Sequence, residues 1–218
     1  MELPNQKQIR TRCESIPLFP LPQVVFFPNT LLRLHVFEPR YVQLLQDCMK
    51  KDRMMAIPRL RLTAGDDTGL PPLYEVAGMG FVIHCKELPD DRYDIVLLGL
   101  GRIRIQTEQQ SERLYRVAQA ELLDDVLPQE QVWEKKQRDI KMMLSQVIMC
   151  NSDISGIFKP LLEKDTSIFQ FVNTLAHLLH RDADVRQKYI EEDGILSKLQ
   201  MVEDAITTIL LSGQIIAE

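Results

Sequence analysis

Short apolar runs alternate with prolines near the start of the chain. The stretch from Pro17 to Tyr41 reads PLFPLPQVVFFPNTLLRLHVFEPRY and holds five prolines. Proline cannot donate to a central β-ladder but is tolerated at strand starts and edges, so IPLFPLP, VVFF and LLRLHVF are predicted to be short strands separated by proline turns. In LLRLHVF the apolar residues alternate with Arg33 and His35, which predicts a strand with one buried face.

A helix and further strands are predicted to follow. Pro39 suits the first turn of a helix, where its missing N–H is not needed, and YVQLLQDCMKKD then places apolar residues at helical spacing. MMAIPRLRL and the long runs LYEVAGMGFVIHCKEL, RYDIVLLGLGRIRIQTE and RLYRVAQAELL have the composition of strands. The glycine pairs in GMG and GLG are expected to mark bulges or tight bends, as at the corners of small closed sheets. The pattern predicts a β-barrel with one embedded helix over residues 15–125.

Helical periodicity replaces this pattern after Pro128. QEQVWEKKQRDIKMMLSQVIMC, SIFQFVNTLAHLLHR and ILSKLQMVEDAITTILL each place apolar residues on one face of a helix, and DVRQKYIEE predicts a shorter one. The chain is therefore expected to belong to the α+β class, with a C-terminal α-helical bundle subdomain over residues 126–218. Residues 1–14 are polar and are predicted to be a flexible lead-in.

Charge and cysteine usage narrow the function classes. The formal net charge is -5 and the acidic excess lies in the second part of the chain, so nucleic acid is not expected as a partner. The four cysteines are widely spaced without a C-x-x-C pair, which favours reduced thiols over a zinc site or a disulfide framework. The N-terminus is polar and no apolar run approaches the roughly 18 residues that a membrane span needs. A cytoplasmic location without membrane association is expected.

The motifs of common enzymes are missing from the sequence. It has no G-K pair for a Walker A loop, and neither G-x-S-x-G nor S-x-x-K, so no catalytic residue, metal ligand or cofactor is assigned. His177 and His180 lie three apart on a predicted helix, but a pair of helix-end imidazoles is favoured over a metal site because no third ligand has suitable spacing. Cys85 follows His84, and adjacent strand residues point to opposite faces, so a structural cysteine is favoured over an activated thiol.

Two pairs of arginines leave an alternative open. Arg59 and Arg61 lie two apart on a predicted strand and so point the same way. Arg102 and Arg104 repeat this spacing. Each pair is either a solvated strand face, which is favoured, or a contact surface for an anionic ligand or RNA.

Phe26 and Phe27 stand in the run QVVFFP, in which residues of both parities are apolar. One face of this segment must therefore find a second apolar partner, which is the barrel core, the helical bundle or a ligand. Burial within the chain is favoured. A groove for hydrophobic polypeptide segments is the functional alternative.

The proline-rich stretch resembles the opening signature of the Lon N-terminal domain family, in which P-L-F-P-L is followed by an apolar pair, F-P and L-x-L-x-x-F-E-P-R-Y. The segment from Tyr74 to Ile83 and the run LPDDRYDIVLLGLGRIRI resemble that family's second block, and FVNTLAHLLHRDADVRQKYIEEDGILSKLQMV resembles its helical part. The resemblance extends from Ile16 to Leu210. Asn29 stands where glycine is usual, and it suits a turn because Asn tolerates a left-handed conformation.

This resemblance implies a PUA-like β-barrel with a helical subdomain, of the kind that recognises polypeptide substrates in ATP-dependent Lon proteases. It implies a non-catalytic module for unfolded or hydrophobic polypeptide segments, acting as an adaptor or recognition factor linked to an ATP-dependent protease. The sequence ends where the ATPase module would begin, and a stand-alone family member is therefore expected. The alternative is an RNA-binding PUA-like protein, whereas no residues support an enzyme acting on a small molecule.

The binding surface is expected near Phe26 and Phe27. Its candidate polar neighbours are Arg33, His35, Glu38 and Arg40. Glu38 and Arg40 flank the predicted helix start, so an ion pair or a helix cap is an equally good interpretation of these two.

Overall fold

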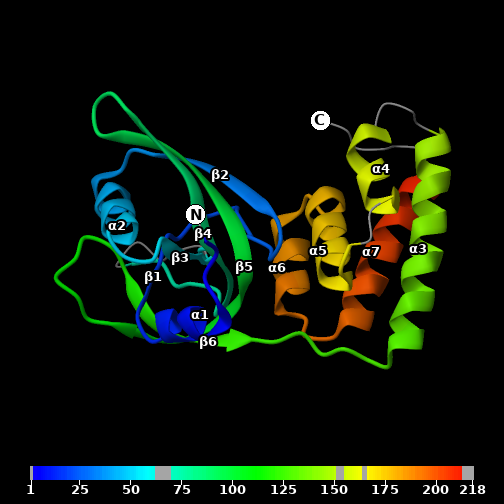
Figure 1. Ribbon diagram of the computed structural model, residues 1–218, viewed down its shortest axis with the longest axis horizontal. Helices are drawn as coiled ribbons and strands as arrows, with labels where there is room; N and C mark the ends of the chain where they lie inside the picture. Colours follow the sequence, from blue (N-terminus) through cyan, green and yellow to red (C-terminus); the bar gives the residue numbers. More distant parts are fainter. Residues whose placement is uncertain (1, 62–69, 151–154, 164–165, 213–218) are drawn as a thin grey trace. The chain divides into compact units, whose positions relative to one another are not determined.

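The computed structural model describes residues 2–61, 70–150, 155–163 and 166–212. The chain divides into two compact units, residues 1–124 and residues 125–218, and both are drawn in Figure 1. The predicted division between residues 125 and 126 falls one residue from this point. Most of the loop predicted from the run AGDDTGLPP lies outside the described residues.

An antiparallel sheet of six strands forms the centre of the first unit. The strands are β1 (Ile16–Pro17), β2 (Leu31–Val36), β3 (Met54–Ile57), β4 (Val76–Leu88), β5 (Arg92–Gln109) and β6 (Val117–Leu123). Their order is β1-β6-β5-β4-β3, with β2 attached to β5. A parallel bridge between Leu18 and Ala56 joins the β1 end of the sheet to the β3 end. This bridge closes the sheet as a barrel, and the predicted α+β class is confirmed (Figure 1).

The longest strand, β5, changes its neighbours along its length. Its first part, residues 92–98, pairs with β2 on one side and β4 on the other. Its second part, residues 102–109, pairs with β6, and the beginning of that part still pairs with β4. The β4–β5 register shifts between Met79 and Gly80, which is the bulge that the glycine pairs predict.

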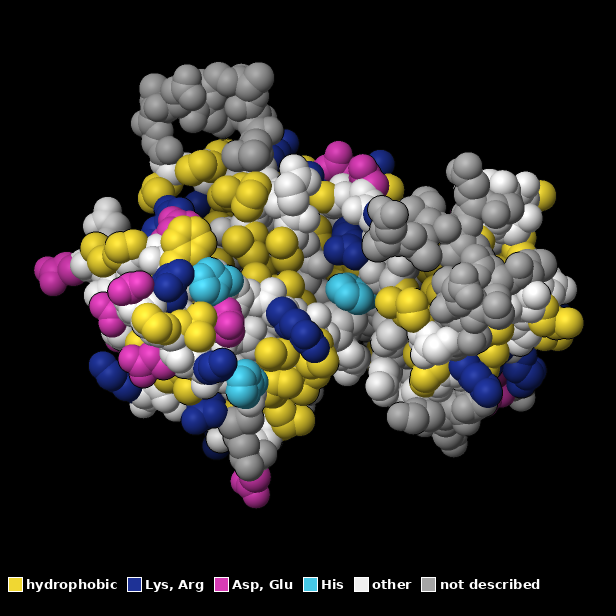
Figure 2. Space-filling view, turned by 90° about the horizontal axis from the view of Figure 1, so that it is seen from above, with side chains coloured by type: hydrophobic (Ala, Val, Ile, Leu, Met, Phe, Trp, Pro, Cys, Tyr) yellow, Lys and Arg dark blue, Asp and Glu magenta, His cyan; other side chains and the backbone are white. Residues whose placement is uncertain are grey.

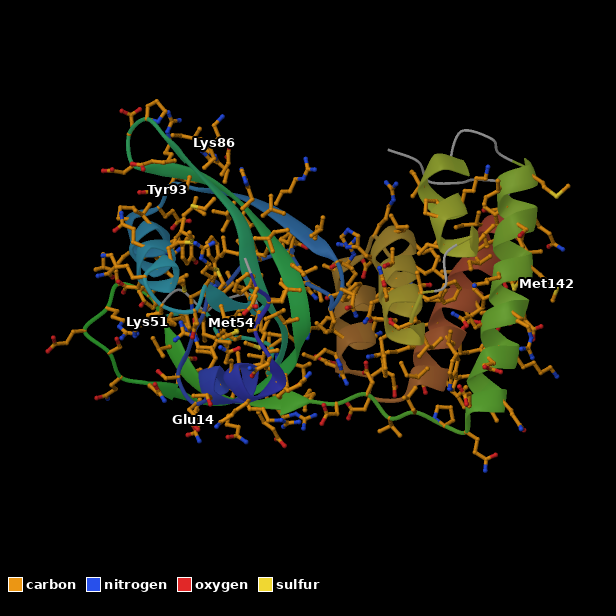
Figure 3. The ribbon with its side chains drawn as sticks, viewed as in Figure 1. Glu14, Lys51, Met54, Lys86, Tyr93 and Met142 are labelled. Carbon is orange, nitrogen blue, oxygen red and sulfur yellow. The ribbon has the colours of Figure 1, made fainter. Side chains whose placement is uncertain are left out.

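Two apolar clusters take alternate residues of the same strands and so lie on opposite faces of the sheet, and one helix contributes to each. The helix α2 (Pro39–Met49) starts with the predicted proline and contributes its apolar face to the first cluster, namely Tyr41, Leu44, Leu45 and Cys48. The helix α1 (Gln6–Cys13) contributes Ile9 and Cys13 to the second. Met54 points into the interior, whereas Glu14 and Lys51 point outward (Figure 3).

The helix α1 corrects the prediction of a flexible lead-in over residues 1–14. Asn5 caps it, because the Asn5 side chain accepts a hydrogen bond from the Gln8 N–H at 3.0 Å and Gln8 Oε1 accepts one from the Asn5 N–H at 2.8 Å. Ile9 and Cys13 lie one turn apart, and both are buried. Only these two positions of the helix are buried, so the polar composition concealed the pattern.

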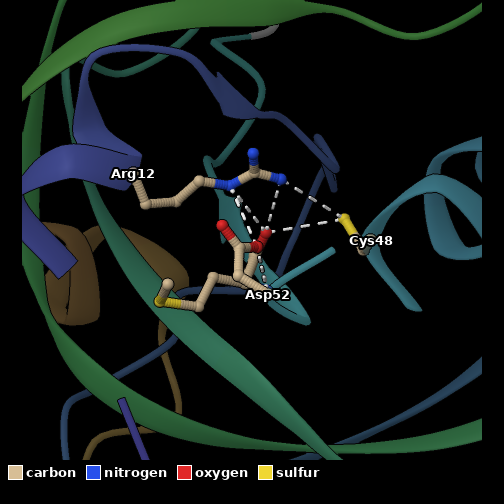
Figure 4. Close-up of polar contacts among 4 residues, drawn as sticks. Arg12, Cys48 and Asp52 are labelled. Atoms are coloured by element: carbon tan, nitrogen blue, oxygen red, sulfur yellow. Dashed lines mark hydrogen bonds and ion pairs between the residues drawn. The ribbon is translucent and has the colours of Figure 1, made fainter. Parts of the chain in front are cut away.

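Arg12 connects α1 to the turn that follows α2. Its Nε lies 3.3 Å from Asp52 Oδ1, and its Nη2 donates to the Met54 carbonyl at 3.3 Å (Figure 4). The Cys48 thiol donates to the same carbonyl at 3.5 Å. Burial raises the pKa of Cys48 to about 12, so this thiol stays protonated at neutral pH and acts as a hydrogen-bond donor rather than a nucleophile.

The run VVFF is not a strand, which corrects the prediction from its composition. Its backbone packs directly against β4 and β5: a Cβ at Gly78 would lie 1.9 Å from the Phe26 carbonyl oxygen, and one at Gly99 would lie 2.1 Å from the Phe27 carbonyl oxygen. These two positions are therefore glycine because another part of the backbone occupies the space of a side chain.

A turn at Asn29 leads from this segment into β2. Asn29 has a φ of 61°, which confirms the left-handed turn expected for this residue. Its N–H donates to the Gly99 carbonyl at 2.9 Å, and the Thr30 hydroxyl donates to the Phe27 carbonyl at 2.8 Å. These bonds fix the point at which β2 begins.

The described residues of the second unit form a helical bundle. Its helices are α3 (Glu130–Cys150), α4 (Ser155–Glu163), α5 (Ile168–Leu179), α6 (Ala183–Glu191) and α7 (Ile195–Ser212). The predicted apolar stripes are confirmed, since Ile140 and Leu144 of α3 and Leu199 and Val202 of α7 are buried. The helix α4 was not predicted, because Pro160 lies inside it and proline usually interrupts a helix.

Replacing Ile9 by alanine tests whether α1 is part of the core. Because Ile9 is 5% exposed, Ile9→Ala is expected to lower the free energy of unfolding by about 2–4 kcal/mol in a urea titration. Thr11→Ala, at an exposed position of the same helix, should change it by less than about 0.5 kcal/mol. Equal, small effects of both substitutions would instead support the prediction that residues 1–14 are flexible.

Gly99→Ala tests the close approach of the two backbone segments. The new methyl group would lie 2.1 Å from the Phe27 carbonyl oxygen, so a loss of at least about 3 kcal/mol of unfolding free energy or failure to fold is expected. Gly156→Ala is the control, because a Cβ there meets nothing within 4 Å and Gly156 lies in α4, where alanine is favoured by up to about 1 kcal/mol. Similar urea midpoints of unfolding for Gly99→Ala and Gly156→Ala would contradict the packing argument.

Candidate functional site

The two phenylalanines predicted at the binding surface are in the core. Phe26 is 2% exposed and Phe27 is 0% exposed, and Phe26 belongs to the apolar cluster under α2. The interpretation favoured from the sequence, burial within the chain, holds for both. The functional alternative is corrected, because neither side chain is accessible to a ligand in this conformation.

The polar candidates on β2 lie on the outer surface of the barrel. Arg33 and His35 are exposed, Leu32 and Leu34 are half-buried, and Val36 is buried, which confirms the predicted alternation. His35 Nδ1 lies 2.7 Å from Asp94 Oδ1, directly across the ladder with β5.

Glu38 and Arg40 form an ion pair at the start of α2. Arg40 Nη2 lies 2.8 Å from Glu38 Oε2, and the guanidinium lies 4.6 Å from the centre of the Tyr41 ring. Glu38 is the N-cap residue, but its side chain makes no capping hydrogen bond. Of the two interpretations, the ion pair is therefore confirmed for Glu38 and Arg40, whereas the side-chain helix cap is wrong. Since both side chains are nearly half exposed, the pair positions Arg40 more than it stabilises the fold.

A pocket of about 550 Å³ opens beside the start of α2. We call it the arginine-rimmed pocket; its lining includes the apolar residues Pro20, Leu60, Leu70 and Leu114, the tyrosines Tyr41 and Tyr115, and the arginines Arg40, Arg113 and Arg116. Of these, only Arg40 was a candidate from the sequence. Tyr41 directly follows Arg40, and the others come from further segments that no motif connects.

The two tyrosines are held by hydrogen bonds at their hydroxyl ends. Tyr115 donates to Asp47 Oδ2 at 2.8 Å, and Tyr41 donates to the Pro20 carbonyl at 3.1 Å. Burial, reinforced by the bond to Asp47, raises the pKa of Tyr115 to about 12. Both hydroxyls are engaged, and the rings provide apolar walls.

The arginines of the rim differ in their partners. Arg116 is paired with Glu108 and donates to the Pro71 carbonyl at 2.8 Å, so its charge is already matched. Arg113 is exposed and lies 5.6 Å from the centre of the Tyr115 ring. No carboxylate among the described residues lies within ion-pair distance of its guanidinium. The pocket thus combines apolar and polar lining residues with one arginine, Arg113, that has no ion-pair partner among the described residues.

The arginine pairs proposed as phosphate contacts are divided by the fold. Arg102 is 2% exposed and donates to the Asp124 carbonyl at 3.4 Å, so the expectation of a solvated face is wrong for it. Arg59 lies 5.1 Å from the centre of the Tyr74 ring and donates to the Pro22 carbonyl at 3.4 Å. Two of the four side chains are therefore engaged within the barrel.

The remaining candidates have structural surroundings. His84 is exposed, whereas Cys85 packs against the core and its pKa is raised by burial. The carbonyls of His177 and His180 accept hydrogen bonds from Arg186, at 2.8 Å and 2.6 Å, so one arginine caps the end of α5. Among the residues that the structure describes, no group of three potential metal ligands occurs.

The barrel and its helical unit have the fold of Lon N-terminal domains. The N-terminal domain of a Mycobacterium avium complex Lon protease aligns with a TM-score of 0.69 at 10% identity, covering 88% of this chain and 98% of that one. A Lon N-terminal domain protein from Xanthomonas campestris aligns with a TM-score of 0.60 at 22% identity, covering 87% and 97%. At these identities the likeness establishes the fold alone.

The chain belongs to the family described as the ATP-dependent protease La (LON) substrate-binding domain, which matches residues 15–208. Lon protease 2 of Myxococcus xanthus is 23% identical over 190 residues, which are 87% of this chain and 23% of that protein. Lon protease of Anaeromyxobacter dehalogenans is 23% identical over 189 residues, 86% of this chain and 22% of that protein. The chain spans about a quarter of the length of these relatives.

The described helices were compared with the length and apolar character of a membrane span. None of those within the described ranges combines the length and the apolar character that crossing a membrane requires.

The two histidines at the end of α5 predict a pH-dependent stability. Burial, together with the charge of Arg186, lowers the pKa of both imidazoles below the usual 6.5. The unfolded chain therefore takes up protons that the folded chain resists, and the free energy of unfolding is expected to fall as the pH drops below about 6.5. Urea titrations at about pH 7.5 and about pH 5.5 measure this fall.

The double variant His177→Gln and His180→Gln is the comparison. Its free energy of unfolding should change less between the two pH values than that of the wild-type chain, because glutamine does not titrate. The same change in both proteins would assign the pH dependence to other groups.

Proposed function

We propose that this chain is a non-catalytic recognition module that binds exposed apolar segments of unstructured polypeptides and serves as an adaptor linked to an ATP-dependent protease. The observation that carries the proposal is the arginine-rimmed pocket, a partly apolar hollow of about 550 Å³ on a barrel of the Lon substrate-binding family. A cytoplasmic location is part of the proposal, and the unpaired, buried thiols of Cys13 and Cys48 suit a reducing compartment.

The lining of the pocket supports a polypeptide ligand. An aliphatic side chain that moves from water into contact with Leu114 and the tyrosine rings gains about 1.5–3 kcal/mol when it is fully buried. The unmatched guanidinium of Arg113 attracts a carboxylate of the same segment. Unfolded proteins expose apolar side chains close to charged ones along one chain, so a single segment supplies both groups.

The pocket suits many clients rather than one. Leu70 and Leu114 are 69% and 62% exposed, so the pocket is open at its rim and the rest of a chain can pass across it. The apolar part of its lining contributes affinity through apolar burial, which depends weakly on sequence, beside the polar and charged side chains that also line it. Such a site selects for the unfolded state of a protein rather than for a particular protein.

A pair of equally exposed residues provides the test. Binding of a fluorescently labelled protein that is kept unfolded by reduction and carboxymethylation is measured by anisotropy. Leu114→Ser, at a position 62% exposed, should weaken binding about tenfold without affecting folding, because it removes apolar contact at the rim of the pocket. Met142→Ser, on α3 at 61% exposure, is the matched control and should bind like the wild-type chain.

The experiment distinguishes failure of the proposed function from failure of the proposed site. If the wild-type chain does not bind the unfolded protein, the proposed function is wrong. If the wild-type chain binds it and Leu114→Ser binds equally well, the function stands and the site lies elsewhere.

A further inference from the structure

One edge of the strand β2 pairs with no strand among the residues that the structure describes. In the part of the chain that the structure describes, β5 is the one strand that pairs with β2. The six residues of β2 follow β5 without a register shift. They contain no proline and no bulge, two devices by which natural proteins block a free edge.

The direction of the backbone groups follows from the alternation of antiparallel pairs. The Gly99 N–H donates to the Thr30 carbonyl at 2.9 Å, which places Thr30 in the hydrogen-bonded class. The even-numbered residues of β2 therefore bond to β5, and the backbone groups of Leu31, Arg33 and His35 face the opposite edge. No described backbone or side-chain group bonds to those three N–H and carbonyl groups.

The inward-facing side chains along this edge are apolar and only partly covered. Leu32 and Leu34 pack against the core cluster yet remain half exposed. Leu31 and Phe37, one at each end of the edge, are 52% and 61% exposed. A further strand beside β2 would place its inward residues over Leu32 and Leu34 and remove this apolar surface from water.

The outer face carries charges in rows that cross three strands. His35, Asp94 and Lys86 form one row, in which the carboxylate lies between two basic groups. Arg33, Val96 and His84 form the next row. That row contains no carboxylate, and Arg33 has no ion-pair partner among the described residues. Figure 2, which views the molecule from above, shows basic and histidine side chains among hydrophobic ones on the barrel.

We propose that β2 binds an extended segment of a client polypeptide as an additional, antiparallel strand of the sheet. The segment exchanges backbone hydrogen bonds with Leu31, Arg33 and His35. It alternates apolar residues, which cover Leu32 and Leu34, with polar residues on the outer face. Because directly opposed residues share a face, an acidic residue opposite Arg33 completes the row that lacks a carboxylate.

This inference rests on the proposed function and adds a second mode of contact. The arginine-rimmed pocket recognises side chains, whereas the β2 edge recognises an extended backbone, which every unfolded client has. Alternating apolar and polar residues are typical of strands that are half buried in the native state of a protein. The preferred clients are therefore proteins whose β-strands have become exposed.

The test removes one backbone donor from the edge. Arg33→Pro deletes an N–H that faces the free edge and leaves the ladder with β5 intact, since proline is tolerated at such a position. Arg33→Ala keeps the N–H and removes the charge. The probe is a capped, fluorescent heptapeptide of alternating valine and glutamate, and its binding is measured by anisotropy, with far-ultraviolet circular dichroism to verify folding.

Arg33→Pro is expected to weaken peptide binding by at least about tenfold, and Arg33→Ala by a smaller factor that disappears at high salt. N-methylation of the glutamates, whose N–H groups face β2 when a glutamate lies opposite Arg33, should abolish binding. N-methylation of the valines, whose N–H groups face away, should leave most of the affinity. This peptide comparison holds even if Arg33→Pro fails to fold.

Three outcomes would overturn the proposal. In the first, Arg33→Pro binds the peptide as well as Arg33→Ala does. In the second, both methylated peptides bind equally. In the third, sedimentation shows a dimer of the chain that Arg33→Pro dissociates, which would assign the edge to a second copy. If the edge fails while Leu114→Ser still weakens binding of the unfolded protein, the proposed function survives without it.

Discussion

The architecture of the barrel depends on the contact of one backbone segment with the glycines of two strands. At Gly78 and Gly99 the carbonyl groups of Phe26 and Phe27 occupy the space that a side chain would need. This contact places both phenylalanines in the core and sets the position of the turn at Asn29. The turn begins β2, and β2 leads directly into α2. The absence of a side chain at Gly78 and Gly99 thus sets the positions of β2 and of α2, the helix beside the pocket.

The same contact explains why the segment richest in apolar residues is not a binding surface. A segment with apolar side chains of both parities needs partners on both faces, and the closed barrel supplies them. The surfaces left for a partner are those that the barrel could not complete. One is a hollow where separate segments meet beside α2, and the other is the edge of β2 that pairs with no described strand. Under the proposed function, recognition and stability depend on different residues of one small sheet.

The sequence predicts most of the fold, because the strands and helices carry the expected periods. The alternation in β2, the helix after Pro39 and the stripes of α3 and α7 are all present. The errors have specific causes. In α1, two buried residues among six polar ones were too few to reveal a helix. In VVFF, the relevant information lies in glycines more than fifty residues away, so no local pattern could show that the segment lacks a ladder.

The site was less predictable than the fold for a related reason. The lining of the arginine-rimmed pocket comes from residues at positions 20, 40–41, 60, 70–71 and 108–116, and the closure of the barrel brings them together. Arg102 shows the opposite error, since an arginine that alternates like a surface residue is buried and bonded to a carbonyl. The pattern of a single sequence predicts helices and strands well. It does not show which residues far apart in the chain lie close together in the fold.

The divided pairing of β5 has a consequence for the entropy of binding. One half of this strand pairs with β6, and the other half lies between β4 and β2. The outer strand therefore inherits the rigidity of a closed barrel, although no described strand pairs with its far edge. A segment that docks there loses its own conformational freedom but does not have to order the receptor as well. Under the proposed strand addition, the surface is ready at the first encounter, and capture of a briefly unfolded chain is limited by diffusion and orientation rather than by a slow rearrangement of the receptor.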